Sequence, residues 1–175
     1  SIVLLFLIGG LLINHPPANA RATSQADLGP IAEMSSDQLF AQVSPGVVKI
    51  YSLNESGKTR GFGSGFFVDD DGLIATNYHV VEGATGLIVE SNSGRRVPVH
   101  RIVGVDPTGD LALLKVEQRP AVVLKLAESR LAAVGSQVYA IGSPVGLKNS
   151  ISPGLISGHR DELLAGITML QTSAP

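Results

Sequence analysis

The sequence predicts an all-β protein in which one closed β-barrel is followed by the beginning of a second. Three observations support this fold class. From Val43 onward the apolar residues come in short runs of strand length, and Gly, Asn, Asp and Pro separate these runs at intervals of roughly 8 to 12 residues. A single stretch without this pattern divides the runs into two groups. The 20 glycines among 175 residues suit a fold that is rich in turns.

Candidate strands before the interruption are numerous enough for a small closed antiparallel barrel. They are residues 47–53, 65–68, 73–77, 86–90, 96–105 and 111–117. We assign this barrel to residues 38–118. The following residues, 119–136, form the connector, because Pro120 and several charged residues break the strand pattern there and residues 127–132 suit a helical turn.

The strand pattern resumes after the connector, in residues 137–141, 150–157 and 167–172. Three strands leave unpaired edges and an open apolar face, so they cannot close a barrel by themselves. We therefore interpret residues 137–175 as the truncated start of a second barrel.

The first residues indicate export from the cytoplasm. Residues 2–13 are an uncharged apolar run, shorter than the roughly 20 residues that a membrane-spanning helix needs. Ala18 and Ala20 follow at the alternate positions of a signal peptidase site. We interpret residues 1–20 as part of a signal peptide, with a retained membrane anchor or a buried core helix as alternatives. Residues 21–37 are polar and irregular, which is typical of a linker.

Composition argues against several classes of partner. The net charge is −2 and the 13 Lys and Arg residues are scattered, so we expect no binding to nucleic acid. Cysteine is absent, which excludes disulfides and a thiolate zinc site. The histidines lack metal-ligand spacing, and His79 and Glu82 would not share a helical face in a strand-to-turn segment. We expect neither a metal nor a cofactor.

His79 and Asp110 are the candidate catalytic residues. His79 follows an apolar strand, and Asp110 directly precedes another, which draws its carboxylate toward the core. An antiparallel barrel can bring the two together, and an imidazole held by a carboxylate makes a general base. From the residues alone, two other interpretations stay open. His79 can be a hydrogen-bonding surface residue, and Asp110 can cap the turn that contains Gly109.

Four segments, in this order, resemble the HtrA/Deg family of trypsin-like serine endoproteases. Residues 63–81 include Gly-Ser-Gly-Phe-Phe-Val and Ala-Thr-Asn-Tyr-His-Val-Val; residues 106–116 read Asp-Pro-Thr-Gly-Asp-Leu-Ala-Leu-Leu-Lys-Val; residues 138–147 and 154–158 complete the set. The resemblance covers the chain from about Val43 to its end. It implies a chymotrypsin/trypsin-like double β-barrel in which His79 and Asp110 are two members of a catalytic triad, without a cofactor.

The resemblance also implies features beyond this sequence. In the family, the strand that ends at Thr172 leads into a Gly-Asn-Ser-Gly-Gly loop, which supplies the nucleophile and the oxyanion hole. The sequence stops at Pro175, before such a loop, and neither Ser64 nor Ser173 corresponds to the nucleophile. We therefore expect residues 1–175 alone to be inactive. A homotrimer packed around Phe40 and PDZ domains farther along the chain are further expectations from the resemblance.

The leading functional hypothesis is a serine endopeptidase that degrades unfolded or damaged proteins in the periplasm or another compartment outside the cytoplasm. The alternative is a catalytically inactive member of the family that acts as a peptide-binding or chaperone module. An unrelated small barrel that binds a ligand is a third hypothesis, although it leaves the ordered match of the four segments unexplained.

Overall fold

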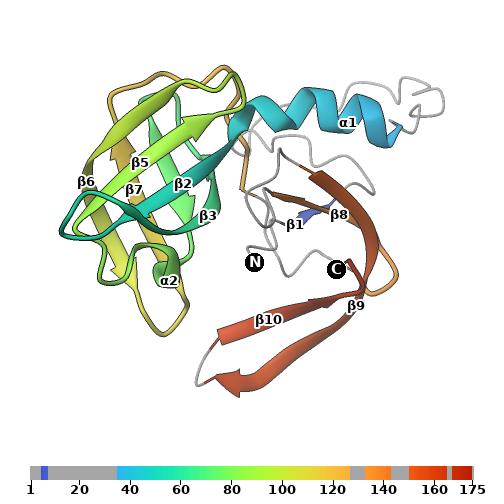
Figure 1. The fold of residues 1–175 in the computed structure, drawn as a ribbon. Helices are drawn as coiled ribbons and strands as arrows, with labels where there is room; N and C mark the ends of the chain where they lie inside the picture. Colours follow the sequence, from blue (N-terminus) through green and yellow to red (C-terminus); the bar gives the residue numbers. More distant parts are fainter. Residues whose placement is uncertain (1–4, 8–34, 127–132, 143–149, 165–166, 175) are drawn as a thin grey trace, which may run out of the picture.

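The computed structural model describes residues 5–7, 35–126, 133–142, 150–164 and 167–174. They form a closed barrel and a separate four-stranded sheet, with one helix lying across the two (Figure 1). The strands are β1 (Leu5–Leu7), β2 (Val47–Leu53), β3 (Thr59–Phe67), β4 (Leu73–Thr76), β5 (Gly86–Ser91), β6 (Arg96–Asp106), β7 (Leu111–Val116), β8 (Gln137–Gly142), β9 (Ser150–Leu164) and β10 (Ile167–Thr172). The helical segments are α1 (Ser36–Val43), η1 (Ser44–Gly46) and α2 (Tyr78–Val81).

The barrel has the order β2-β3-β4-β7-β6-β5 and closes where β5 pairs with β2. All of its neighbouring strands are antiparallel. This confirms the predicted all-β class and the complete first barrel. The main difference lies in β3, which begins at Thr59 and not at residue 65. Its first half contains glycines that weaken a strand pattern, but β2 offers a full row of pairing partners that overrides this weakness.

Alternate residues of the strands point inward and fill the barrel. The most deeply buried of these include Val48, Ile50, Phe67, Ile74, Val89, Leu114 and Val116. The inward positions of β3 also include Gly65, and a Cβ there would lie 2.8 Å from the side chain of Ile50 and 2.9 Å from the carbonyl oxygen of Ala75. Only a glycine therefore lets β3 approach β2 and β4 this closely.

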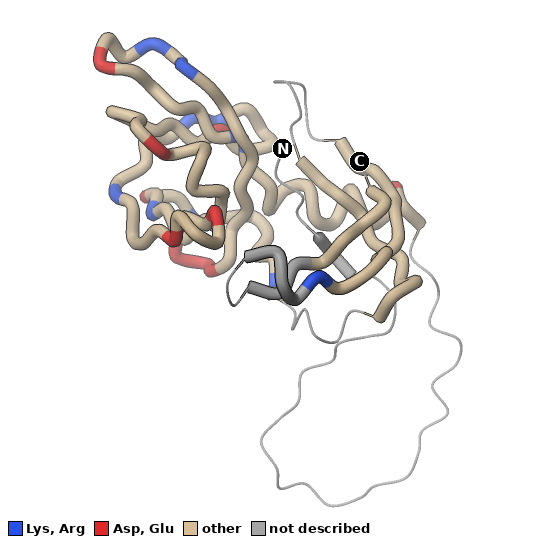
Figure 2. The backbone as a smooth tube through the Cα atoms, turned by 90° about the horizontal axis from the view of Figure 1, so that it is seen from below, with Lys and Arg blue, Asp and Glu red and all other residues tan. Residues whose placement is uncertain are grey.

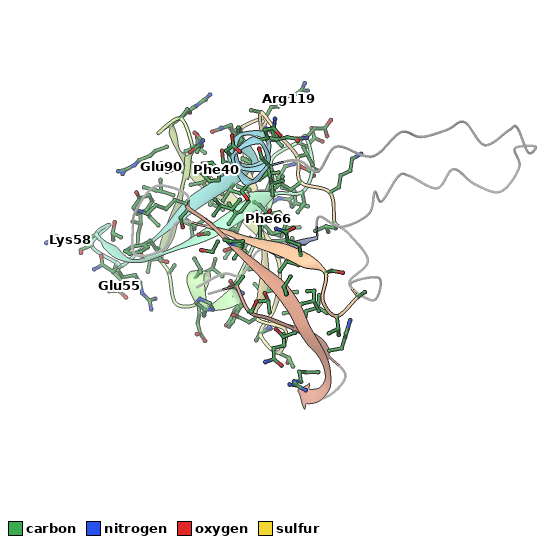
Figure 3. All side chains as sticks on the ribbon, turned by 90° about the vertical axis from the view of Figure 1, so that its right-hand side faces the viewer. Phe40, Glu55, Lys58, Phe66, Glu90 and Arg119 are labelled. Carbon is green, nitrogen blue, oxygen red and sulfur yellow. The ribbon has the colours of Figure 1, made fainter. Side chains whose placement is uncertain are left out.

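A second apolar cluster joins the barrel to the other sheet. Its buried members are Leu39, Val47, Leu124, Tyr139 and Ile141, and we call these residues the junction cluster. Phe40 and Phe66 pack against this cluster, and both are labelled in Figure 3. No packing partner for Phe40 within the chain was evident from the sequence. The structure shows that Phe40 packs against the junction cluster. The homotrimer itself stays a prediction.

The second sheet has the order β1-β8-β9-β10, and all of its pairs are antiparallel. It is an open sheet within the residues that the structure describes, which confirms the predicted incomplete second barrel. β1 lies inside the segment that we interpreted as a signal peptide, and Leu5 is paired with Ala140 of β8. No helix among the described residues is long and apolar enough to cross a membrane.

Two helices were not predicted from the sequence. α1 begins at Ser36, inside the range that we interpreted as a linker, and the side chain of Gln38 accepts a hydrogen bond of 3.1 Å from the backbone N–H of Ser35. α2 replaces a predicted turn after β4. The helical turn that we expected over residues 127–132 lies outside the described residues.

Candidate active site

His79 lies on α2, a single helical turn at one end of the barrel (Figure 1). The helix directly follows β4, and Asn77 is the residue that precedes its first turn. Val80 and Val81 are buried in the barrel core, while the side chain of His79 is 53% exposed. The sequence thus forms a short helix whose two valines fix it to the barrel and whose imidazole faces outward.

Strands β2 and β3 hold α2 in place. The hydroxyl of Ser52 donates a hydrogen bond to the carbonyl oxygen of Val80, and the guanidinium of Arg60 donates one of 2.9 Å to the carbonyl oxygen of Glu82. These bonds satisfy carbonyl groups that a helix end leaves without partners. Gly63 of β3 lies against Val80, and a Cβ on this glycine would come within 2.3 Å of the valine. The position of His79 therefore depends on close contact between α2 and the β2–β3 hairpin.

Asp110 ends the turn between β6 and β7. The carboxylate of Asp106 accepts a hydrogen bond of 3.0 Å from the backbone N–H of Gly109, so Asp106 caps this turn. Asp110 itself has a φ of 51° and is the single non-glycine residue with positive φ among the described residues. A left-handed backbone costs about 1 to 2 kcal/mol for a residue with a Cβ, although Asp tolerates it better than most. With this backbone the Asp110 carboxylate faces α2. The residue that caps the turn is Asp106 and not Asp110.

The structure brings His79 and Asp110 together. One carboxylate oxygen, Oδ2, lies 2.7 Å from Nδ1 of the His79 imidazole, and the other, Oδ1, accepts a hydrogen bond of 2.8 Å from the His79 backbone N–H. The contact at Nδ1 favours the tautomer that carries its proton on this nitrogen. Nε2 then keeps the lone pair that a general base uses.

The Asp110 carboxyl is held in its charged form. Burial raises its pKa, but the hydrogen bonds from the His79 backbone and imidazole, together with the electrostatic interaction with His79, lower the pKa by more. The pKa of Asp110 is therefore below its usual value. The side chain is 43% exposed, so the carboxylate lies closer to solvent than its place before an apolar strand suggested.

Asn77 adds a contact that the sequence did not reveal. Its side-chain amide, through Nδ2, donates a hydrogen bond of 3.0 Å to the carbonyl oxygen of Asp110. Its Oδ1 atom is buried and has no partner among the described residues. The two residues are far apart in the sequence, and an Asn before a helix is usually a local cap, so spacing offers no sign of this contact.

The serines that we excluded as nucleophiles occupy structural positions. Ser64 is buried in β3, and the hydroxyl of Ser173 accepts a hydrogen bond of 2.9 Å from the backbone N–H of Leu155.

The described part of the chain contains no group of three or more His, Cys, Asp or Glu side chains that could hold a metal ion. Figure 2 shows basic and acidic residues in short, separate stretches of the barrel backbone.

Comparison with known proteins assigns the chain to a family. The sequence model described as a trypsin-like peptidase domain matches residues 63–175. The chain belongs to this family of trypsin-like peptidases, in agreement with its closed barrel and second open sheet. The resemblance to the HtrA/Deg branch is also confirmed, because curated relatives are named as DegP-like proteases.

The relatives are bacterial proteins that each carry the name probable periplasmic serine endoprotease DegP-like. The one from Halomonas elongata is 45% identical over 102 residues, which are 58% of this chain and 21% of the relative. The one from a Marinomonas species is 40% identical over 103 residues, or 59% of this chain and 22% of the relative. The one from Bartonella henselae is 36% identical over 119 residues, or 66% and 24%. The matched part of this chain thus spans less than a quarter of the length of these relatives.

Proposed function

We propose that this chain is the front part of a serine endopeptidase in which His79 is the general base and Asp110 orients it. The observation that carries the proposal is the double contact between the two residues, in which both Asp110 oxygens bind His79. A carboxylate with this geometry fixes the imidazole ring and its tautomer and stabilises the imidazolium that forms during the reaction.

The proposed reaction proceeds through an acyl-enzyme. A serine hydroxyl attacks the carbonyl carbon of the peptide bond while its proton moves to Nε2 of His79. The imidazolium then donates this proton to the nitrogen of the leaving amine, and the C–N bond breaks. A water molecule then attacks the carbonyl carbon of the acyl group while its proton moves to Nε2 of His79. The imidazolium returns this proton to the serine oxygen, and the C–O bond to the serine breaks. We place the serine and the oxyanion hole in a loop after β10, beyond Pro175, on the basis of the family resemblance.

The compartment, substrates and assembly are part of the same proposal. The relatives are named as periplasmic enzymes, and residues 1–20 have the features of an export signal, so we place the protein outside the cytoplasm, secreted or held by an anchor. Unfolded or damaged polypeptides are the substrates we infer. A homotrimer and PDZ domains after the peptidase domain complete the proposed whole protein.

A second candidate function is peptide binding without cleavage. Exposed apolar side chains on two neighbouring strands favour it, because exposed apolar patches often bind other polypeptides. They lie on β6 and β7 and are Ile102, Val103, Val105, Leu111 and Leu113. A full-length protein that prevents aggregation of unfolded proteins but cleaves none of them would support this function.

Casein digestion by the full-length protein tests the protease. We expect H79A to reduce kcat nearly as far as loss of the serine, because the members of a triad act as one unit. D110N should reduce kcat on the order of 10⁴-fold, as the equivalent change does in a chymotrypsin-type enzyme, since an amide favours the wrong imidazole tautomer.

A surface histidine provides the control for this test. His100 lies on β6, where its Nδ1 is 3.6 Å from the carboxylate of Glu117. H100A should leave casein digestion unchanged, because the contact partner of His100 is Glu117 and not a member of the proposed triad. If H79A and D110N both digest casein as well as the wild type, the two residues have no catalytic role.

A further inference from the structure

The contact between Asp110 and His79 requires an unusual backbone. Asp110 reaches both the backbone N–H and the imidazole of His79 while its φ is 51°. Left-handed backbone is rare for a residue with a side chain and persists where the surroundings enforce it. The neighbouring turn contributes little, since the bond from the Asp110 N–H to the Pro107 carbonyl oxygen is long, at 3.4 Å. A further group must hold Asp110 in this conformation.

The side chain of Asn77 is placed to do so. It donates a hydrogen bond of 3.0 Å to the carbonyl oxygen of Asp110. The backbone of Asn77 also contacts α2, where its carbonyl oxygen accepts a hydrogen bond of 3.3 Å from the N–H of Val80. One residue therefore connects the helix that carries His79 to the backbone that carries the carboxylate.

The ordinary role of an Asn at this position is not what the structure shows. Asn before a helix usually accepts a hydrogen bond from the second or third N–H of that helix. The side chain of Asn77 makes no such bond. The N–H of His79, the second residue of α2, instead binds Oδ1 of Asp110, so the aspartate takes the capping role and the asparagine binds the aspartate.

The environment of the Asn77 amide gives it a small role in the stability of the fold. Its Oδ1 atom is buried and lacks a partner in the part of the chain that the structure describes. Burial of a polar atom without a hydrogen bond is unfavourable, and an apolar side chain of the same shape avoids this cost. An apolar side chain at position 77 would lack only the hydrogen bond from Nδ2 to the carbonyl oxygen of Asp110.

We propose that Asn77 is a positioning residue that holds Asp110 in the left-handed conformation, so that both carboxylate oxygens face His79. Its side chain binds the backbone of Asp110, so it acts on His79 through Asp110. The effect on turnover rests on the proposed protease function, whereas the effect on the His79–Asp110 contact does not.

NMR of the His79 imidazole in the full-length protein tests the contact independently of activity. The wild type should show a strongly downfield Nδ1–H proton, which H79A identifies by its absence. We expect N77A and N77L to lose or broaden this signal and N54A to keep it. Asn54 is a matched control, because its Oδ1 accepts hydrogen bonds from Ser56 and Lys58 in the β2–β3 turn.

Turnover provides the second readout. We expect N77A and N77L to lower kcat on the order of 10²-fold with little change in KM, because a small displacement of a catalytic group has this effect. N77L should unfold at no lower temperature than the wild type, which separates positioning from a loss of stability.

Two results would overturn the proposal. One is an unchanged downfield signal in both N77A and N77L. The other is a loss of the signal that accompanies general unfolding in N77L as well as in N77A. If the NMR signal changes as expected but H79A leaves casein digestion intact, the positioning role stands and the proposed protease function fails.

Discussion

At the scale of single residues, the charge of Asp110 links the candidate site to the stability of the fold. The pKa of its carboxyl is lowered in the folded state, which therefore favours the carboxylate. Its contribution to the free energy of unfolding is fully present above the unfolded pKa of about 3.9 and is lost as the pH falls through the lower folded value. We therefore expect the difference in unfolding temperature between the wild type and D110N to shrink from about pH 5 to about pH 3.

Thermal unfolding at several pH values measures this difference. D70N is a suitable control, because Asp70 lies on an exposed turn between β3 and β4, and its curve should run parallel to that of the wild type. A constant difference between the wild type and D110N across this pH range would contradict the prediction.

The pair of candidate residues could be predicted from the sequence, but the way they are held together could not. His79 and Asp110 were predicted as neighbours from their places at strand ends, and their side chains do meet. Asp110 has a left-handed backbone after the turn that Asp106 caps, and Asn77 donates a hydrogen bond to its carbonyl oxygen. The contact with Asn77 joins the residue after β4 to the residue before β7, and no local sequence pattern predicts it.

At the scale of elements, strands were easier to predict than short helices. Six strands of the barrel follow apolar runs that are visible in the sequence. α1 is only two turns long and begins in a polar segment, yet Ser35 and Gln38 have the spacing of a capping box and could have revealed it. α2 has no such pattern. It forms because Val80 and Val81 are buried against β2 and β3, which is a tertiary effect.

The contact between β3 and α2 gives a prediction at this scale. A Cβ at Gly63 would lie 2.3 Å from Val80, so G63A should displace α2 and lower the free energy of unfolding by about 1 to 3 kcal/mol. The displacement should also weaken the His79–Asp110 contact and the activity of the full-length protein. Denaturant unfolding and casein digestion measure the two effects.

Gly61 in the same strand is the matched control. Apart from Gly61 and its two chain neighbours, no described residue has an atom within 4 Å of the position that a Cβ on Gly61 would take. G61A should therefore have little effect on either measurement. Equal behaviour of G61A and G63A would show that the packing of α2 against β3 does not limit the position of His79.

At the scale of the whole molecule, the all-β class and the division into a closed barrel and an open sheet were predicted correctly. The junction cluster was not predicted, because it combines α1, Val47 of the barrel and Tyr139 of the second sheet. Its residues come from distant segments that show no common spacing. The hydroxyl of Ser36 adds a hydrogen bond of 3.2 Å to the Tyr139 hydroxyl across the same junction.

Export of the protein is the prediction that concerns the whole molecule. The test fuses residues 1–30, as the complete gene encodes them, to a reporter that is active only outside the cytoplasm. We expect the reporter to be active. Replacement of Leu11 and Leu12 by Arg should abolish export, since charge disrupts the apolar run. A wild-type fusion that stays in the cytoplasm would contradict the prediction.

His79, Asn77 and Asp110 all belong to the first barrel, so the order of synthesis decides when their site can form. The barrel closes with strands that end at Val116, and ribosomes make the chain from its N-terminus. The base can therefore assemble on a nascent polypeptide well before the proposed serine beyond residue 175 is made. If the proposed serine lies in that later segment, a nascent chain in this state holds the proposed base before its nucleophile has been made.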